Sequence, residues 1–251
     1  PSKRREAGRI PMGGSRMADR FRPRAARPVR GRASLVGRRE LEDWGPGLWD
    51  VEGSFSRDVA GVDEAGRGSL AGPVVAAAVV LPPGVILPGL ADSKLLTPAV
   101  RARLADAIRG VATAWAVAAV EASEIDATDI LRATLRAMAE AVRQLSPQPR
   151  LVLVDGSIAP RLLVPVRAVV HGDRRVPLIS AASILAKVTR DRIMVDWAAR
   201  FPAYGFAQHK GYGTAAHRAA IALHGPLPIH RRTFAGVREY TGEAVRQACL
   251  W

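Results

Sequence analysis

Cysteine is almost absent from this chain: its 251 residues include one cysteine, Cys249, close to the C-terminal end. A single cysteine excludes an intramolecular disulfide framework and a zinc site built from several thiolates. The histidines form no pair at helical metal-ligand spacing next to an acidic residue, which also disfavours zinc. Any metal site therefore has to be sought among carboxylates.

Long apolar helices are also missing from the pattern. The uncharged residues 70–91 have the length of a membrane span, but four prolines and three glycines divide them into a Val/Ala strand and a loop. The N-terminal residues lack the apolar core of a secretory signal peptide. We therefore expect a cytoplasmic protein that has no membrane partner.

Negative charge is scarce near the N-terminus. Residues 1–39 contain 13 Lys or Arg and two acidic residues, so they carry +11 of the formal charge of +14. Their Arg, Pro, Gly and Ala content predicts disorder. This tail either adds salt-sensitive affinity for nucleic-acid phosphates or lies upstream of a true start at Met12 or Met17.

Two adjacent carboxylates follow the strand expected at residues 58–62. Asp63 and Glu64 precede a glycine-arginine-glycine turn at residues 66–68, which would let backbone N–H groups and a guanidinium approach a phosphate or sugar. Adjacent acids repel each other unless a cation or proton neutralises them. A solvated hairpin turn is the structural alternative, and this motif alone does not decide between the two.

Two further apolar runs also end in acidic residues. Asp155 follows residues 151–154, and Asp173 follows residues 164–170. If these strands stop at the same edge of one sheet, the four carboxylates could converge. Carboxylates without a neutralising lysine among them suit hard divalent cations such as Mg²⁺ or Mn²⁺.

Positive charge and aromatic rings gather again between residues 187 and 238, where nine Lys or Arg accompany two acids. Such interleaving suits a surface that binds phosphates and packs rings on sugars or bases. Phe206 and Tyr204 are better interpreted as core residues, whereas Tyr212, between two glycines, is the better candidate for substrate contact.

Lys187 and Asp191 have the spacing of an ion pair on one helix. This structural interpretation is preferred for Asp191. For Lys187, the choice between an ordinary ion pair and a phosphate contact is left open.

The rest of the pattern alternates between strands and helices, which predicts an α/β fold. Strands are expected at residues 58–62, 73–81, 114–120, 151–154 and 164–170, and helices at 98–110, 126–145, 179–200 and 214–223. Asp126 or Thr128 is expected to cap the second helix. One catalytic domain at residues 51–240 would lie between a basic extension at 1–50 and a tail at 241–251.

Taken together, these motifs resemble bacterial ribonuclease HII. The match runs in order from about Val59 to Phe234 and includes DEAGRG at 63–68, DSK at 92–94, ISAASILAKVTRDR at 179–192 and HKGYGT at 209–214. The resemblance implies an RNase H-like fold: a mixed central sheet flanked by helices, with a C-terminal helical and loop extension.

The same resemblance implies an endoribonuclease that cuts the RNA strand of RNA/DNA hybrids and incises 5′ to ribonucleotides embedded in duplex DNA, with a role in replication and repair. Asp63, Glu64, Asp155 and Asp173 would hold two Mg²⁺ or Mn²⁺ ions, and the products would carry 5′-phosphate and 3′-hydroxyl ends. The expected substrate contacts are Gly66, Arg67 and Gly68 at the 2′-hydroxyl, Tyr212 at the RNA–DNA junction, and Lys94, Lys187 and Lys210 at phosphates.

Two other functions share some of these features. A DNA-directed nuclease or transposase of the same fold family needs the carboxylates but no 2′-hydroxyl, and the turn at 66–68 disfavours it. A non-catalytic duplex-binding protein would keep the acids for structure alone, and the complete set of four disfavours that reading. We expect a monomer.

Overall fold

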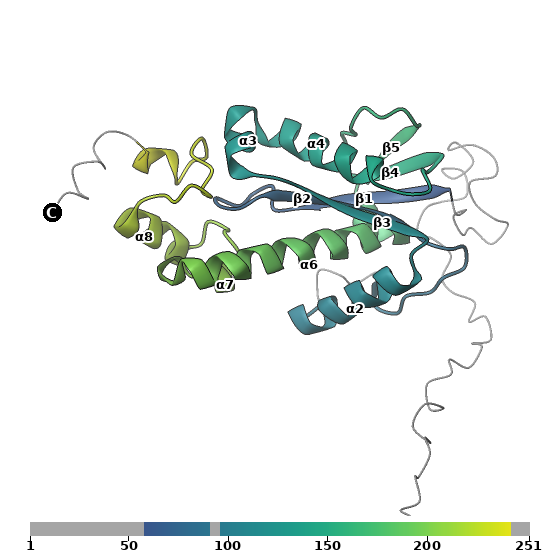
Figure 1. Cartoon of the computed structure of the whole chain (residues 1–251), viewed down its shortest axis with the longest axis horizontal. Coiled ribbons are helices and arrows are strands. Elements are labelled where there is room, and N and C mark those ends of the chain that lie inside the picture. Colours follow the sequence, from purple (N-terminus) through teal and green to yellow (C-terminus); the bar gives the residue numbers. More distant parts are fainter. Residues whose placement is uncertain (1–57, 91–95, 242–251) are drawn as a thin grey trace, which may run out of the picture. The chain divides into compact units, whose positions relative to one another are not determined.

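A computed structural model describes residues 58–90 and 96–241 of the chain (Figure 1). The expectations for the extension at 1–50, for Lys94 and for tail residues 242–251 lie outside these residues. The strands are β1 (Val59–Ala65), β2 (Val74–Val80), β3 (Ala114–Val120), β4 (Leu151–Asp155) and β5 (Val166–Val169). The helices are α2 (Pro98–Val111), α3 (Ala122–Ala127), α4 (Ile130–Arg143), α5 (Gly172–Arg175), α6 (Pro177–Arg200), α7 (Phe206–His209) and α8 (Ala215–His224), with short 3-10 helices η2 (Pro202–Tyr204) and η3 (Arg238–Tyr240).

The strands form a mixed sheet in the order β3-β2-β1-β4-β5. β2 pairs antiparallel with both β1 and β3, whereas β4 pairs parallel with both β1 and β5. Adjacent parallel strands bring their carboxyl ends to the same edge of a sheet. The expected α/β fold with a mixed central sheet is confirmed, and residues that follow β1, β4 and β5 are neighbours in space.

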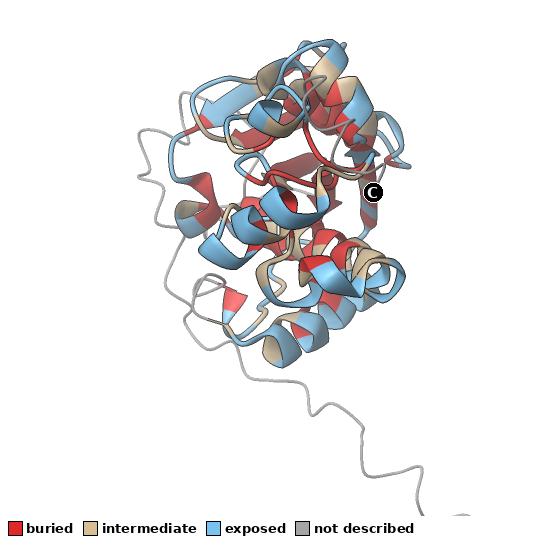
Figure 2. Ribbon diagram, turned by 90° about the vertical axis from the view of Figure 1, so that its left-hand side faces the viewer, coloured by how far each residue is buried: buried red, intermediate tan, exposed pale blue. Residues whose placement is uncertain are grey.

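Helices cover both faces of this sheet (Figure 1). α3 and α4 pack on one face, α2 and α6 pack on the other, and each face has its own apolar core. Figure 2 shows that buried residues lie along the strands and on the helix sides that face them. β2 is buried along its whole length. A strand that is covered on both faces has apolar residues at every position, which explains the uninterrupted run of Val and Ala in β2.

The start of α6 lies directly on β1. A Cβ atom added at Gly61 would stand 2.2 Å from the carbonyl carbon of Leu178 and 2.4 Å from the backbone nitrogen of Ile179. Glycine is therefore required at this position for α6 to approach the strand that carries the first two acids. Within the described residues, no helix combines the length and the apolar character needed to cross a bilayer.

The helix expected at 126–145 is divided into α3 and α4, and the expected caps are wrong. Asp129 caps α4, because its carboxylate accepts a hydrogen bond from the Arg132 N–H at 2.8 Å. Asp126 lies in α3 and instead accepts from the backbone N–H groups of Arg232 (2.8 Å) and Thr233 (3.0 Å). It thereby fastens a loop more than 100 residues away, a role that local sequence does not reveal.

Beyond α6 the chain forms the expected C-terminal helical and loop extension. The elements η2, α7 and α8 surround a third apolar core, in which Phe206 and Tyr204 are buried as predicted. An isolated β-bridge pairs Ser69 with Tyr212. This bridge places the segment that follows β1 against the C-terminal extension.

Candidate active site

The four predicted carboxylates occupy one edge of the sheet. Asp63 and Glu64 lie near the end of β1, and Asp155 is the last residue of β4. Asp173 lies in the first turn of α5, shortly after β5. Asp63 and Asp173 are buried, with 5% and 3% of their surface exposed. The parallel order of β1, β4 and β5 is what brings these acids together.

Backbone N–H groups fix two of the carboxylates. The Glu64 N–H donates to Asp63 Oδ1 at 2.7 Å, and the Asp173 N–H donates to Asp155 Oδ1 at 3.2 Å. The Ser180 hydroxyl on α6 donates to the Asp173 carbonyl oxygen at 2.6 Å. The turn that carries Asp173 is therefore anchored both to β4 and to α6.

Crowding and burial disfavour the charged forms of these acids. Burial raises the pKa of Asp63 well above its ordinary value, and the negative charges of Glu64 and Asp155 raise it further. A hydrogen bond from Ser183 lowers the pKa and offsets part of this rise. Burial also raises the pKa of Glu64, an effect that the Arg67 guanidinium partly offsets. A bound cation would relieve this repulsion.

The donor chemistry of the four acids fits a divalent cation. Their ligand atoms are all carboxylate oxygens, which suit Mg²⁺ and Mn²⁺ rather than zinc. Across the part of the chain that the structure describes, no group of three or more His, Cys, Asp or Glu side chains already stands in a metal-holding arrangement. The carboxylates would therefore have to close around an ion as it binds.

The two glycines of the turn at 66–68 differ in their surroundings. Gly66 has φ +95°, and an added Cβ would stand 2.0 Å from Arg190 Nε. Gly68 has no atom within 4 Å of an added Cβ. The fold itself requires glycine at Gly66, whereas the open space at Gly68 is available to a ligand. Arg67, between them, is half exposed and reaches Glu64 Oε1 at 3.4 Å.

Two buried arginines hold this turn and the residues that follow it from inside the protein. Arg190 of α6 and Arg231 of the C-terminal extension are both fully buried. Arg190 donates to the Pro73, Ala71 and Lys210 carbonyl oxygens and to the Ser69 hydroxyl, at 2.7–3.0 Å. Arg231 donates to the Gly66, Arg67 and Gly72 carbonyl oxygens, at 2.7–3.2 Å.

These contacts correct the interpretation of the basic segment at 187–238. Burial lowers the pKa of Arg190. Burial and the charge of Arg190 lower the pKa of Arg231 to about 9, so Arg231 remains cationic at neutral pH. Their donors are used on backbone carbonyl oxygens rather than displayed to phosphates. The sequence offered no signal for this role, because nothing in the local pattern marks either arginine as buried.

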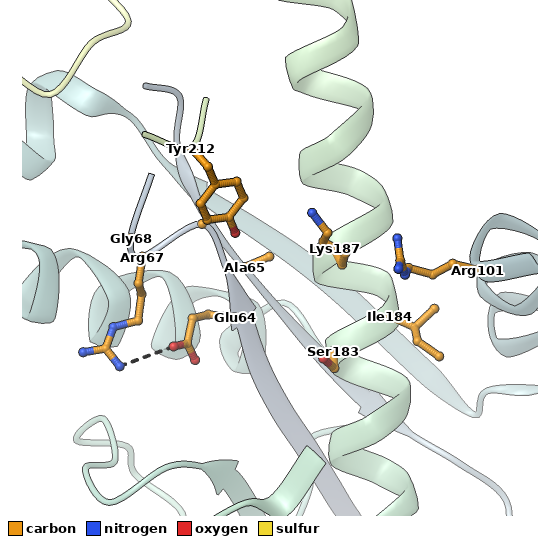
Figure 3. A pocket seen from close by; sticks show the side chains of 10 residues that line it. Glu64, Ala65, Arg67, Gly68, Arg101, Ser183, Ile184, Lys187 and Tyr212 are labelled. Atoms are coloured by element: carbon orange, nitrogen blue, oxygen red, sulfur yellow. Dashed lines mark hydrogen bonds and ion pairs between the residues drawn. The ribbon is translucent and has the colours of Figure 1, made fainter. Parts of the chain in front are cut away.

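Tyr212 stands beside this turn at the edge of a cleft of about 410 Å³ (Figure 3). Tyr212 is 36% exposed, as expected for a residue between two glycines. Lys187 Nζ lies 5.5 Å from the ring centroid, within the range of a cation–π contact. The cleft is lined by residues 64–68, Arg101, Ser183, Ile184, Lys187 and Tyr212.

The predicted pair of Lys187 and Asp191 is present, with Nζ and Oδ1 separated by 2.7 Å. It is not isolated, because Arg101 of α2 lies 3.9 Å from the second Asp191 oxygen. Asp191 thus joins two cations that line the cleft. Lys210 donates instead to the Ala207 carbonyl oxygen and does not line the cleft.

Comparison with known proteins bears directly on this site. Residues 60–237, which include all four acids and the turn, match the family model for ribonuclease HII. The chain belongs to the ribonuclease HII family. The ribonuclease HII of Geobacter sulfurreducens is 53% identical over 203 residues, which cover 79% of this chain and 94% of that relative.

Solved structures agree with this membership. The ribonuclease H2 of Pyrococcus horikoshii superposes with a TM-score of 0.62 at 28% identity, over 75% of this chain and 99% of that one. Bst-RNase HIII in complex with Mn²⁺ gives a TM-score of 0.60 at 20% identity, over 80% of this chain and 72% of that one, and shares the fold. The RNase H-like fold is confirmed, and the Bst-RNase HIII structure shows a protein of this fold in complex with a divalent cation.

Proposed function

We propose that this chain hydrolyses the RNA strand of RNA/DNA hybrids and incises 5′ to ribonucleotides embedded in duplex DNA. The products would carry 5′-phosphate and 3′-hydroxyl ends, as needed for ribonucleotide removal during replication and repair. The observation that supports the proposal most is that Glu64, one of the four acids at the sheet edge, lines the same cleft as the turn at 66–68 and Tyr212 (Figure 3).

The carboxylates of Asp63, Glu64, Asp155 and Asp173 would hold two Mg²⁺ or Mn²⁺ ions. When bound, such ions activate water and neutralise charge that develops at the scissile phosphate. The protein orients its acids through the Glu64 and Asp173 N–H groups and keeps Asp63 away from bulk water. The raised pKa of Asp63 supports this role, because a group crowded by like charge gains most from a cation.

The turn at 66–68 would recognise the 2′-hydroxyl of the ribonucleotide. Arg231 binds the carbonyl oxygens of Gly66 and Arg67 from the inside, so the opposite side of the turn is left for the substrate. The open space at Gly68 admits a ribose. Since the 2′-hydroxyl distinguishes RNA from DNA, this contact would give the enzyme its selectivity.

Tyr212 would pack at the RNA–DNA junction, and Lys187 would contact a backbone phosphate. The exposure of the Tyr212 ring and the position of Lys187 in the same cleft support these roles. Lys210 and Lys94 are weaker candidates for phosphate contacts. The proposal includes a monomer that acts on duplex substrates in the cytoplasm.

Cleavage of matched duplexes tests this function. One labelled DNA duplex carries a single ribonucleotide, one strand is all RNA against DNA, and one duplex is all DNA. Each is incubated with Mg²⁺, with Mn²⁺ and with EDTA. The proposal predicts metal-dependent incision 5′ to the ribonucleotide and cleavage of the hybrid, with the all-DNA duplex intact. Cleavage of all three would favour a DNA-directed nuclease, and binding without cleavage would favour a non-catalytic duplex-binding protein.

A further inference from the structure

Beneath Tyr212 lies a pair of buried imidazoles that no part of the proposed chemistry uses. His217 belongs to α8 and His230 to the following loop, and at most 1% of either residue is exposed. Their Nε2 atoms are 3.1 Å apart. A third imidazole, His209, stacks on His217 with ring centroids 4.3 Å apart.

The hydrogen bonds around this pair determine which nitrogen of each neutral imidazole carries the proton. The Leu227 N–H donates to His230 Nδ1 at 2.9 Å, so the proton of neutral His230 resides on Nε2. His230 Nε2–H then donates to His217 Nε2, which leaves the proton of His217 on Nδ1. His217 Nδ1–H donates to the Tyr212 carbonyl oxygen at 3.0 Å. The chain of donors therefore runs from a loop N–H to the backbone of the exposed tyrosine.

The electrostatics of the site keep this chain intact at neutral pH. Burial lowers the pKa of His217 and of His230 to about 4 in each case. The positive charge of Arg218 also disfavours protonation of His217, and that of Lys210 disfavours protonation of His209. If His217 were protonated, two N–H groups would face each other across the Nε2 contact, and if His230 were protonated, its Nδ1–H would face the Leu227 N–H.

Tyr212 is fixed on its other sides by backbone contacts. Its N–H donates to the His209 carbonyl oxygen at 2.9 Å, and the preceding Gly211 carbonyl oxygen accepts from Leu70 at 2.8 Å. Its bridge to Ser69 joins it to the segment that contains the turn at 66–68. On the side of the C-terminal extension, the Tyr212 carbonyl oxygen accepts from the Thr214 N–H at 2.8 Å and from His217, which supplies the side-chain donor.

We propose that His217 and His230 are positioning residues that hold Tyr212 in register with the turn at 66–68, and that they determine how well the enzyme cuts at single ribonucleotides. This inference rests on the proposed function. A purely structural pair would stabilise the extension without affecting substrate choice. The positioning role is favoured because the donor chain ends on the backbone of Tyr212 itself.

Two amide substitutions at His217 separate these roles. The amide of His217→Gln can still accept from His230 but no longer donates where Nδ1 did, so the bond to Tyr212 is lost. The amide of His217→Asn can still donate to the Tyr212 carbonyl oxygen but no longer reaches His230. His224→Gln, at an exposed position on the same helix, is the matched control.

The readout is the ratio of kcat/KM on a single-ribonucleotide duplex to kcat/KM on a long RNA/DNA hybrid. Loss of one buried neutral hydrogen bond corresponds to about a tenfold change, so His217→Gln should lower the ratio by about that factor. His217→Asn should restore most of the loss, and His224→Gln should match the wild type. Equal losses in the Gln and Asn variants would overturn the positioning role.

A second measurement does not depend on activity. Long-range ¹H–¹⁵N correlation spectra of histidine-labelled protein at pH 7 should show His217 protonated on Nδ1 and His230 on Nε2. The opposite tautomers would contradict the donor chain. If the tautomers are as expected but the wild type cuts neither substrate, the proposed function fails, and the role of His217 and His230 in substrate choice fails with it. If the wild type cuts both substrates, an unchanged kcat/KM ratio in His217→Gln refutes the positioning role alone.

Discussion

Gly66 and Gly68 belong to one motif, yet the structure predicts opposite consequences for an added methyl group. In Gly66→Ala the new Cβ would stand 2.0 Å from Arg190 Nε and 2.4 Å from its Cδ. Arg190 cannot easily move aside, because its guanidinium donates hydrogen bonds to the carbonyl oxygen of Pro73 and to that of Lys210 in the C-terminal extension. The backbone at Gly66 also has φ +95°, which L side chains rarely adopt.

The loss of stability in Gly66→Ala follows from the steric overlap with Arg190 and from the left-handed backbone. A left-handed backbone costs about 1–2 kcal/mol for alanine, and overpacking a filled site costs about 1–3 kcal/mol. Gly66→Ala should therefore lower the free energy of unfolding by about 2–5 kcal/mol, which corresponds to a Tm lower by about 5–15 °C in a domain of this size. Gly68→Ala should stay within about 0.5 kcal/mol of the wild type.

Thermal unfolding of both variants, followed by cleavage of a single-ribonucleotide duplex, checks the argument. We expect Gly68→Ala to keep its stability but to lose cleavage by tenfold or more, at about 1.4 kcal/mol per tenfold, because its methyl group enters the space assigned to the ribose. If Gly66→Ala unfolds at the wild-type temperature, the account of the turn is wrong. Full activity in Gly68→Ala would leave that account standing but remove the ribose contact.

Two further predictions concern buried cations and imidazoles. Arg231→Lys loses the forked contacts to the turn and should lower the free energy of unfolding in urea by about 2–4 kcal/mol, whereas Arg232→Lys at an exposed position should not; equal effects would contradict the role of Arg231. The pKa values of His217 and His230 are lowered from 6.5 to about 4. Below pH 6.5 the unfolded chain therefore binds protons that the native state excludes. The free energy of unfolding should fall as the pH drops from about 6.5 to about 4. One imidazole can contribute at most about 3 kcal/mol to this fall. Urea unfolding at about pH 7 and about pH 4.5 should show that His217→Gln loses less free energy of unfolding than the wild type. An identical loss would show that His217 does not cause the pH dependence.

The sequence predicted the acidic edge of the sheet because the relevant signals are local. Apolar runs mark the strands, and an acid that follows each run marks a position at or just beyond the carboxyl end of a strand. The inference that Asp63, Asp155 and Asp173 meet needs only parallel neighbours, which the observed order β1-β4-β5 supplies. The exposure of Tyr212 was predictable for the same reason, since its two glycine neighbours cannot cover it.

Residues that act through distant partners could not be predicted in this way. Arg190 and Arg231 bind carbonyl oxygens of residues more than 100 positions earlier, yet both sit in segments that read as ordinary basic surface. Asp126 looked like a helix cap but binds the loop at Thr233. His217 and His230 show no periodic signal at all. Tertiary contacts fixed the role of each of these side chains.

The central claim is that the acidic sheet edge performs metal-dependent hydrolysis. The most direct measurement is cleavage of a single-ribonucleotide duplex in Mn²⁺ by Asp63→Asn, with Asp106→Asn on the exposed face of α2 as control. Removing a proposed ligand should lower kcat/KM by about 100-fold or more. Because the substitution also removes a buried, repelled charge, the metal-free variant should unfold at a temperature no lower than the wild type. Wild-type cleavage by Asp63→Asn would contradict the account, whereas a stable, inactive variant beside an active control is the result that it predicts.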